Sequence, residues 1–315
     1  MIITFVGNFS VSYTSETHHA NTLAMSGHQV HRLQEGKVPI EVILEVAKTS
    51  NLLVWVHTHG WKQPSDTGLT TADLFKELKK IGIPTMTYHL DLWFGLQRQK
   101  DLEQDDFYKS IEHFFTVDKL MADWFNDNTE VKGHYLPAAV YQPEAVIDKT
   151  GGMQNDVIFV GSRGYHPEWQ YRPQLIDWLR ATYGNKFKHF GNDGLGVVRG
   201  QALNQLYGSS KVVIGDSLCI DYEYPHYWSD RVYETLGRGG FMIHPFIEGM
   251  DKHFDNKKHL VFYNFGDFAD LKNKIDYYLE HDTEREEIRL AGHEHVKKNH
   301  TYTNRWQTII QELGL

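Results

Sequence analysis

Short apolar runs alternate with longer stretches of helical periodicity through the first half of the chain. The runs that indicate buried strands cover residues 2–7, 27–33, 51–60, 83–93, 114–117 and 134–140. Apolar positions three and four apart predict a helix ending at 21–26 and helices at 40–49, 72–81, 107–113 and 118–126. Strands that alternate with helices in this way predict a parallel sheet with helices on both faces.

The same alternation starts afresh after the polar stretch 142–155, which contains Pro143, Gly151 and Gly152 and is the best linker candidate. Strands are predicted within residues 156–164, 186–192, 211–217, 241–245 and 259–264. Helices are predicted at 173–182, 201–208, 229–238, 267–281, 283–299 and 302–312. The pattern therefore predicts an α/β fold of two doubly wound domains that join near residue 150.

Length, charge and cysteine usage fit this reading. A chain of 315 residues has room for two domains of about 150 residues each. The net charge of −9 argues against a broad electrostatic grip on nucleic acid or anionic membrane, and still allows a local basic groove. Cys219 is the one cysteine, which suits a reducing cytoplasm. The N-terminus reads as a first strand, and no apolar run approaches the roughly 18 residues of a membrane span.

The segment Tyr227–Pro245 joins a short helix to a buried strand. Ser229 is a good helix N-cap, because its hydroxyl can accept from a free backbone N–H, and Asp230 suits the positive end of the helix dipole. Glycines at 239 and 240 tolerate the left-handed conformation that ends helices.

Arg231 and Glu234 lie three residues apart and so share one face of this helix. A glutamate and an arginine beside glycines and a buried strand suit an anionic, polyhydroxyl ligand such as a nucleotide. The alternative is a surface ion pair of Glu234 with Arg231 or with Arg238.

Ligands of open parallel sheets bind beyond the carboxyl ends of the strands, so polar residues that follow apolar runs are site candidates. In the first half these are Gly7, Asn8, His57, His59, His89 and Asp91. In the second half they are Gly161, Ser162, Arg163, Gly191, Asn192, Asp216 and Ser217.

Three chemistries are open to the histidines. His57 and His59 lie two apart, as do His89 and Asp91, so each pair would face one way on a continuing strand. Together they could bind zinc, although a third ligand cluster is absent from the sequence. They could also serve as acids, bases or hydrogen-bonding groups in a polar cleft, or simply cap strand ends.

The loop that begins at Gly161 carries two glycines and two arginines, Arg163 and Arg172. Backbone N–H groups of such a loop can cradle phosphate, and arginine can bind phosphate through two hydrogen bonds. The loop has neither a dinucleotide-binding nor a Walker pattern, so an ordinary surface loop is the alternative.

Taken together, these segments resemble a GT-B glycosyltransferase, and most closely glycosyltransferase family 4 in its spore-maturation-protein (CgeB-like) branch. SDRVYETLGRGGFMIHP is similar to the family's Ser-x-Arg-x-x-Glu-x-x-x-x-Gly-Gly stretch, and HTYTNRW to the closing motif of the branch. VIFVGSRG resembles the opening strand and phosphate loop of the donor domain. The likeness is looser in the first half, at GHQVHRL, VWVHTHG, TMTYHLD and HYLPAAV.

The resemblance implies roles residue by residue. Glu234 matches the glutamate that hydrogen-bonds the ribose of a nucleotide sugar, Arg163 matches a cation at the diphosphate, and Arg231 assists it. His89 matches a histidine near the transferred sugar. The remaining candidates are Asp91 and His59 for catalysis, and Gly161, Ser162, Arg172, Ser229 and Asp216 for donor binding.

Two departures from the family pattern concern the sugar and the diphosphate. A first glutamate normally stands eight residues before Glu234, where this chain has His226; His226, Asp221 or Glu223 could replace it. The lysine that usually follows the phosphate arginine is missing, and Arg172 is a possible substitute.

The sequence therefore predicts a GT-B fold of two Rossmann-like domains with a cleft between them. Residues 1–148 would bind the acceptor, residues 149–298 the nucleotide sugar, and the helix at 299–315 would cross back to the first domain. The predicted activity is transfer of a hexose or pentose from a UDP-sugar or GDP-sugar to a hydroxyl, with retention and without a metal or other cofactor.

The predicted partners are the nucleotide sugar and an acceptor that is a saccharide, a protein, a small molecule or modified DNA. One alternative is a phage-type glycosyltransferase acting on a hydroxymethylated DNA base. A second is a metal-dependent hydrolase that uses His57, His59, His89 and Asp91. A non-catalytic nucleotide-binding module and an epimerase are further rivals.

Overall fold

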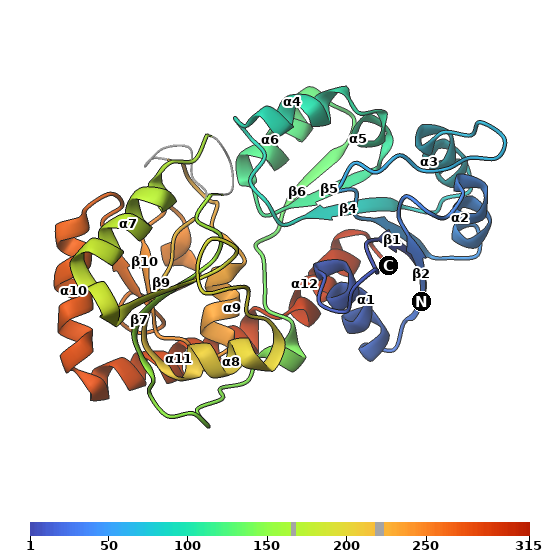
Figure 1. The fold of residues 1–315 in the computed structure, drawn as a ribbon. Coiled ribbons are helices and arrows are strands. Elements are labelled where there is room, and N and C mark those ends of the chain that lie inside the picture. The colour runs from blue at the N-terminus through green and yellow to red at the C-terminus, as the bar shows by residue number, and fades with distance from the viewer. Residues whose placement is uncertain (165–167, 218–223) are drawn as a thin grey trace. The chain divides into compact units, whose positions relative to one another are not determined.

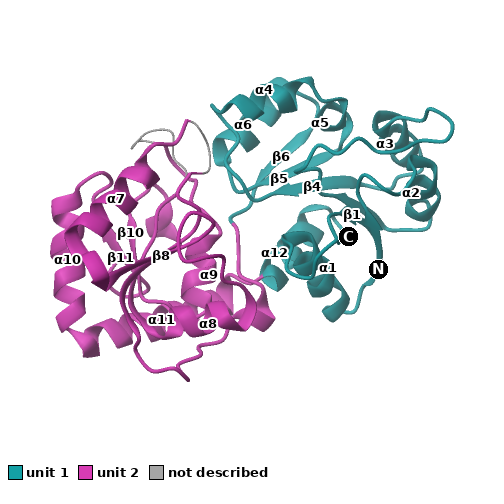
Figure 2. Ribbon diagram, viewed as in Figure 1, with its two compact units in different colours: residues 1–137, 302–315 teal, residues 138–301 magenta. Residues whose placement is uncertain are grey.

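The structure is a computed structural model that describes residues 1–164, 168–217 and 224–315. Its Cα packing divides this chain into two compact units, coloured separately in Figure 2. Unit 1 contains Met1–Pro137 and Tyr302–Leu315, and unit 2 contains Ala138–Thr301. The polar stretch at 142–155 thus belongs to unit 2, and the last helix of the chain belongs to unit 1.

Unit 1 is built on six parallel strands in the order β2-β1-β3-β4-β5-β6. The strands are β1 (Ile2–Gly7), β2 (Gln29–Gln34), β3 (Leu52–Trp55), β4 (Thr85–His89), β5 (His113–Thr116) and β6 (Lys132–Tyr135). The helices are α1 (Ser15–Met25), α2 (Ile40–Ala47), α3 (Thr71–Lys80), α4 (Gln97–Gln104), α5 (Asp106–Ser110), α6 (Lys119–Asn128) and α12 (Tyr302–Glu312). Figure 1 shows α1 and α12 on one face of this sheet and the other helices on the opposite face.

Local sequence accounts for where several of these helices begin. Thr70 and Asp73 form a capping box at α3, in which each side chain satisfies a backbone N–H of the other residue. Asp118 caps α6 through the N–H of Met121, and Asp105 caps α5. These caps satisfy N–H groups that have no partner inside a helix.

The structure corrects the sequence prediction at four places in unit 1. Strand β3 ends at Trp55, so the residues from 56 to 60 form no strand. Helix α4 was not predicted because its residues are nearly all polar and only Leu102 is buried. His113 begins β5 instead of ending a helix. The stretch Leu136–Val140 is not a strand, since β6 stops two residues before Pro137.

The last helix completes the core of unit 1. Trp306 of α12 is buried and donates its indole N–H to Nδ1 of His19 on α1, 3.1 Å away. The His19 ring stacks on Tyr302, with ring centres 4.0 Å apart, and Trp306 meets Phe5 of β1 edge to face. Burial lowers the pKa of His19 to about 3, so the ring is neutral and accepts this hydrogen bond.

Unit 2 repeats the architecture with five parallel strands in the order β11-β10-β9-β7-β8. The strands are β7 (Asn155–Val160), β8 (Phe187–Phe190), β9 (Ser210–Ile214), β10 (Met242–Pro245) and β11 (Val261–Tyr263). The helices are α7 (Tyr171–Tyr183), α8 (Gly200–Gly208), α9 (Arg231–Gly237), α10 (Phe268–Glu280) and α11 (Asp282–Asn299), with short 3₁₀ turns η1 (Gln142–Glu144), η2 (Gly184–Lys186) and η3 (Met250–Lys252). Helices α7 and α10 cover one face of the sheet, and α8 and α9 cover the other (Figure 1).

A single buried arginine ties the helices of unit 2 together. Arg289 of α11 donates to the carbonyls of Tyr207, Gly239 and Ser210. The Tyr207 carbonyl lies in the last turn of α8, where no helical N–H is available to it, and Gly239 lies just beyond α9. The Arg289 guanidinium therefore caps α8 and joins the segment after α9 to α11.

Helix α9 is shorter than the sequence predicts. Its N-cap is Asp230, and it ends at Gly237, before the two glycines at 239 and 240. Ser229 lies one residue outside the helix, yet its Oγ accepts from the N–H of Arg231 at 3.2 Å and donates to Asp230. The predicted role of this hydroxyl is therefore kept, while the helix begins one residue later.

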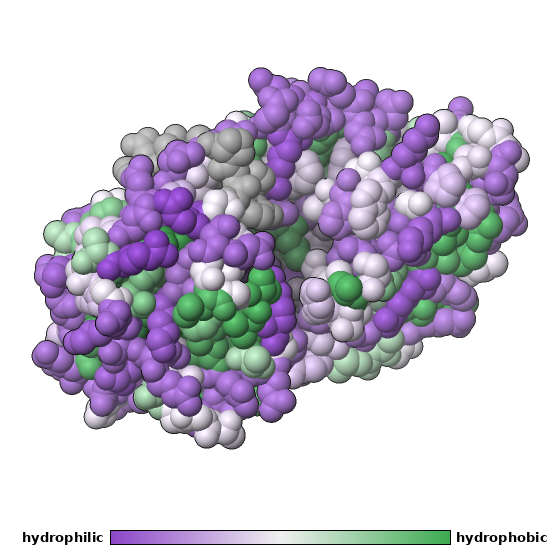
Figure 3. Space-filling view, viewed as in Figure 1, coloured by the Kyte–Doolittle hydropathy of each residue, from purple (hydrophilic) through white to green (hydrophobic). Residues whose placement is uncertain are grey.

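The exposed face drawn in Figure 3 is mostly hydrophilic, with one continuous hydrophobic patch on unit 2 and smaller hydrophobic groups elsewhere. This follows from the packing of the apolar sides of strands and helices into the two cores. Among the helices that the structure describes, none is both long enough and apolar enough to cross a membrane.

We predict that Trp306→Ala destabilises unit 1 by about 3–5 kcal/mol, because it leaves a cavity and removes the partner of His19. Urea unfolding followed by circular dichroism would show the transition of unit 1 at lower urea. Gln307→Ala changes an exposed neighbour on the same helix and should leave the transition unmoved. Equal unfolding of both variants would mean that α12 adds little to the core of unit 1.

Candidate functional site

The strand order of unit 2 marks one place on its sheet for a ligand. The chain runs from β7 to β8 on one side and then returns to β9 on the other side of β7. Crevices at such a reversal, beyond the carboxyl ends of the strands, are where open α/β sheets bind ligands. Gly161 and Ser162 follow β7, and Asp216 and Ser217 follow β9, so all four lie at this reversal.

Gly161 makes room for the guanidinium of Arg231. Gly161 has φ of +151°, and a Cβ built on it would lie 2.1 Å from Nη1 of Arg231. The Gly161 carbonyl accepts from Nε2 of His189, 2.6 Å away, and its N–H donates to the Phe190 carbonyl. The backbone after β7 is thereby held in place, and only glycine lets Arg231 approach it.

Arg231 brings an unused donor to the site. Its Nη1 is buried and has no hydrogen-bond partner among the residues that the structure describes. Burial opposes its charge, but the neighbouring Tyr207, Asp230 and Glu234 more than offset this and raise the pKa of Arg231. A cation with a free, buried N–H is costly unless a ligand satisfies it, which marks this position as a binding site for an acceptor group.

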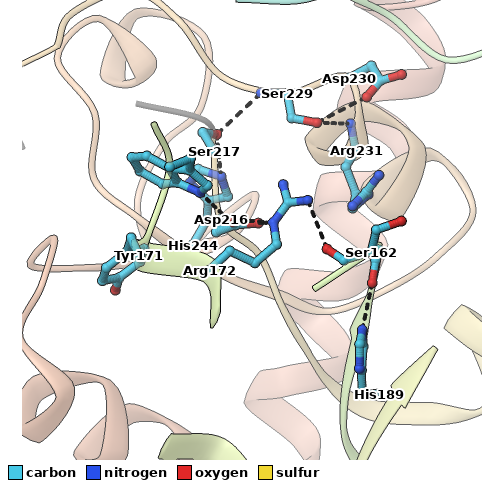
Figure 4. A network of polar contacts seen from close by, with 12 residues as sticks. Ser162, Tyr171, Arg172, His189, Asp216, Ser217, Ser229, Asp230, Arg231 and His244 are labelled. Carbon is cyan, nitrogen blue, oxygen red and sulfur yellow. Dashed lines mark hydrogen bonds and ion pairs between the residues drawn. The ribbon is translucent and has the colours of Figure 1, made fainter. Parts of the chain in front are cut away.

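A second buried arginine lies on the other side of Ser162. Nε of Arg172 donates to both carboxylate oxygens of Asp216 at 2.9 and 3.1 Å, and its Nη1 donates to the Ser162 carbonyl at 3.1 Å. Trp169 also donates to Asp216, at 3.4 Å. Figure 4 shows the guanidinium groups of Arg172 and Arg231 both pointing toward Ser162.

A chain of neutral hydrogen bonds links the end of β9 to the start of α9. His244 donates from Nδ1 to the Pro245 carbonyl, which leaves Nε2 to accept from Ser217 at 3.1 Å. The Ser217 hydroxyl in turn accepts from the N–H of Ser229 at 3.2 Å. Burial lowers the pKa of His244 to about 4, so this chain carries no charge at neutral pH.

Glu234 does not form the predicted alternative, a surface ion pair with Arg231 or Arg238. Its carboxylate has no salt bridge or hydrogen bond to any residue within the described parts of the chain. Arg238 is bonded to Glu144 and Asn204 instead. Burial, with the nearby Asp230, raises the pKa of Glu234 despite the two arginines on the same helix. Both charged groups that α9 presents, at 231 and 234, thus keep unused hydrogen-bonding capacity.

Arg163, the predicted diphosphate cation, lies elsewhere. Its guanidinium is half-exposed and bonded to the carboxylate of Asp177 on α7, with Nη2 to Oδ2 at 2.5 Å. The structure thus brings together six of the eight predicted donor residues: Gly161, Ser162, Arg172, Asp216, Ser229 and Arg231. Glu234 lies one helical turn after Arg231 and is not bonded to them. Arg163 shares their loop but not their network.

Sequence reasoning missed His189 and His244. Both lie inside strands, whereas the search considered residues that follow strands. A histidine within an otherwise apolar strand was the signal that could have found them. His226 has φ of +52°, and its ring fits closely over Gly249, where a Cβ would lie 2.2 Å from Nδ1. Asp221 and Glu223, the other possible replacements for the missing glutamate, lie outside the described residues.

In unit 1 the predicted histidines have separate surroundings. His89 is buried between Phe114 and Trp93, with Nε2 bonded to the Tyr108 hydroxyl at 3.2 Å, and burial lowers its pKa to about 3. His59 is exposed, stacks on Trp61 and approaches Asn8 at 3.5 Å.

Asp91 pairs with Arg98 at 3.7 Å. His57 uses both ring nitrogens: Nδ1 on Glu35 and Nε2 on Asp105 at 3.3 Å. No three His, Cys, Asp or Glu side chains in the described ranges are placed to share a metal ion. Because His57 is bonded on both sides, it has no lone pair to offer a metal. The four residues of the hydrolase alternative therefore do not form one site.

The chain was compared with protein families and with curated proteins. A family model described as glycosyl transferase-like matches residues 172–311, which include α9 and the helices after it. No curated protein matches the chain.

Solved structures match the chain over its whole length at low identity. A glycosyltransferase from Rickettsia africae is 13% identical with a TM-score of 0.62, covering 99% of this chain and 97% of its own. HepE from Anabaena in complex with UDP-glucose is 11% identical with a TM-score of 0.68, covering 100% and 99%. An alpha-glucosyltransferase in complex with UDP and a 13-mer DNA containing an HMU base is 9% identical with a TM-score of 0.71, covering 100% of both chains. The fold is GT-B.

We predict that His57 stabilises unit 1 in a pH-dependent way. Burial favours the neutral ring, but hydrogen bonds to Asp105 and Glu35 outweigh it and raise the pKa of His57 to about 9. The protonated ring therefore contributes stability fully below pH 6.5, and this contribution, about 3 kcal/mol at most, disappears as pH rises through 9.

Urea unfolding of wild type and of His57→Gln between pH 6 and pH 10 would measure this contribution. The difference in unfolding free energy should shrink as pH rises, whereas the exposed His59→Gln should show no such trend. A constant difference for His57→Gln across this range would contradict the prediction.

Proposed function

We propose that this protein is a glycosyltransferase that transfers a sugar from a nucleoside-diphosphate sugar to a hydroxyl acceptor, with the donor held by unit 2. The observation that carries the proposal is the buried Nη1 of Arg231, which has no partner among the described residues and approaches Gly161 where the strand order reverses. A diphosphate at this place would satisfy Nη1 and meet a cation already held in position.

Two side chains of α9 fit two parts of one donor. Arg231 and Glu234 share a helix face, and the Glu234 carboxylate is free to accept hydrogen bonds from two vicinal hydroxyls, as a ribose presents. Arg231 is directed at the backbone after β7, where the diphosphate is proposed to lie. Because Arg231 and Glu234 lie one helical turn apart, they can contact the diphosphate and the ribose of the same donor.

The proposed chemistry relies on fixed positive charge. Departure of the nucleoside diphosphate builds negative charge, which cations held in place favour over the ground state. Arg231 and Arg172 supply this charge next to Ser162, and Asp216 holds Arg172 in its orientation. Arg163 joins them only by leaving Asp177. Two arginines beside the diphosphate make transfer without a metal ion chemically reasonable.

The proposed donor is a UDP-sugar, because structures similar in fold were solved with UDP or UDP-glucose. A GDP-sugar is the second candidate. The motifs around Arg231 and His300 favour the family 4, CgeB-like branch and hence a retaining transfer of a hexose or a pentose. We assign the sugar contact to His226, whose left-handed backbone is a strained conformation of the kind found at functional sites.

We propose that unit 1 binds the acceptor. His59 and Asp91 are accessible there and are the candidates to contact it, whereas His89 is buried with its Nε2 bonded to the Tyr108 hydroxyl. A saccharide, a protein or a small molecule suits the net charge of −9 better than DNA does. Modified DNA stays a candidate because one structure of the same fold holds DNA with an HMU base.

We predict that Glu234→Ala weakens binding of UDP by about tenfold to a hundredfold, because the ribose loses hydrogen bonds to a carboxylate. Arg231→Gln should weaken it by a similar factor through the diphosphate. Titration calorimetry with UDP-, GDP- and ADP-sugars measures both effects. Arg180→Gln, an exposed position on α7, is the matched control and should bind as wild type does. The proposal fails if no nucleotide sugar binds or if Glu234→Ala leaves affinity unchanged.

We also predict that Gly161→Ala lowers affinity for UDP by at least about tenfold, because the added methyl displaces the Arg231 guanidinium. Gly164→Ala lies in the same loop, where an added Cβ meets nothing within 4 Å, and should be silent. Calorimetry and melting curves of the two variants separate lost binding from lost folding. Normal UDP affinity in Gly161→Ala would show that Arg231 does not hold the diphosphate.

A further inference from the structure

Unit 1 contains a pocket that the donor site does not use. Its volume is 690 Å³, within the range of about 300–1,000 Å³ of pockets that enclose small molecules. It opens where α2, α3 and α5 begin, near the carboxyl end of β3. Its lining includes His57, Trp61, Lys62, Gln63, Thr71 and Asp105.

A row of three charged groups forms one wall of this pocket. Glu35 is buried and bonded both to the indole N–H of Trp55, at 3.0 Å, and to Nδ1 of His57. Nε2 of His57 is paired with Oδ2 of Asp105 at 3.3 Å. His57 and Asp105 both line the pocket, and the Asp105 side chain, 37% exposed, is the more accessible of the two.

The position of Asp105 is set by two further contacts. Oδ1 accepts from the N–H of Phe107 at 2.9 Å, which caps α5. Oδ2 is held by His57, which Glu35 holds in turn. The carboxylate is therefore immobilised on the protein side, while its remaining lone pairs face the pocket and accept hydrogen bonds only.

An aromatic ring lies in the same pocket. Trp61 is 38% exposed, and its Cβ packs close to Gly36, where an added Cβ would lie 3.1 Å away. The ring of His59 stacks on it with centres 4.5 Å apart. Gln63 is buried and fixes the loop through the N–H of Gly36 and the carbonyl of Val38. The contacts with Gly36 and His59 thus hold Trp61 in place without a ligand.

We propose that this pocket binds a saccharide, with Asp105 accepting hydrogen bonds from its hydroxyls and Trp61 packing on the C–H face of a sugar ring. An immobilised carboxylate next to an exposed indole offers acceptors for vicinal hydroxyls and a flat apolar surface together. A role for this saccharide as the acceptor rests on the proposed function, whereas its binding does not.

The charge of the lining favours a saccharide over a nucleic acid. Lys62 and the protonated His57 are the positive groups of the lining that the structure describes. Asp105 and Glu35 offset both charges, so no excess of positive charge would attract a phosphate backbone. A neutral ligand rich in hydroxyls needs no such charge, because its O–H groups can donate to the remaining lone pairs of Asp105.

Saturation-transfer NMR with the full chain tests the proposal. The probes are maltose, cellobiose, laminaribiose, lactose and N,N′-diacetylchitobiose, with a hydroxymethylated DNA duplex as a separate arm. We expect at least one disaccharide to bind, and Asp105→Asn and Trp61→Ala each to weaken its affinity by about tenfold or more. Asparagine still caps α5, so Asp105→Asn removes the charge without removing the cap.

Asp101→Asn is the matched control, since Asp101 is an exposed carboxylate on α4 outside the pocket. It should bind the disaccharide as wild type does, and UDP affinity should be the same in all three variants. The proposal is overturned if no disaccharide binds, if Asp105→Asn and Trp61→Ala bind normally, or if DNA alone binds with dependence on Asp105. Loss of UDP binding with disaccharide binding intact would instead count against the donor site alone.

Discussion

The polar network of unit 2 depends on the close approach of Arg231 to the backbone of Gly161. Any side chain at 161 would occupy the place of the guanidinium, since a Cβ there would lie 2.1 Å from Nη1. The approach puts the buried Nη1 of Arg231 beside Ser162, where Arg172 also points. This Nη1 has no hydrogen-bond partner in the part of the chain that the structure describes. Without this approach, the end of β7 would be an ordinary glycine loop and Glu234 an isolated carboxylate one turn further along α9.

The two units differ in which charged side chains are paired within the protein. In unit 2, Asp216 orients Arg172, while Nη1 of Arg231 and the Glu234 carboxylate keep capacity for a ligand. In unit 1, His57 lies between Glu35 and Asp105, and this row leaves only the Asp105 carboxylate open to the pocket. The first arrangement suits an anion, and the second suits a neutral ligand with many hydroxyls.

Much of the fold could be read from the chain, because the apolar runs of parallel strands and the caps of their helices are local signals. Helix α12 was predicted at its observed residues, and Thr70 and Asp118 act as the caps their side chains indicate. Helix α4 was not predicted because only Leu102 among its residues is buried. Strand β3 was predicted too long because the apolar Val56 follows Trp55. In both places tertiary contacts, which carry no local pattern, decided the outcome.

The sequence by itself determined the class of fold, the two sets of strands and the face of α9 that carries Arg231 and Glu234, since periodicity and spacing are properties of neighbouring residues. Only the tertiary structure decided which cation lies in the network. Arg163 follows β7 directly, yet its side chain meets Asp177 of α7, whereas Arg231 comes from a helix seventy positions along the chain. The strand order brings the ends of β7 and β9 together, and that order depends on contacts far apart in the chain.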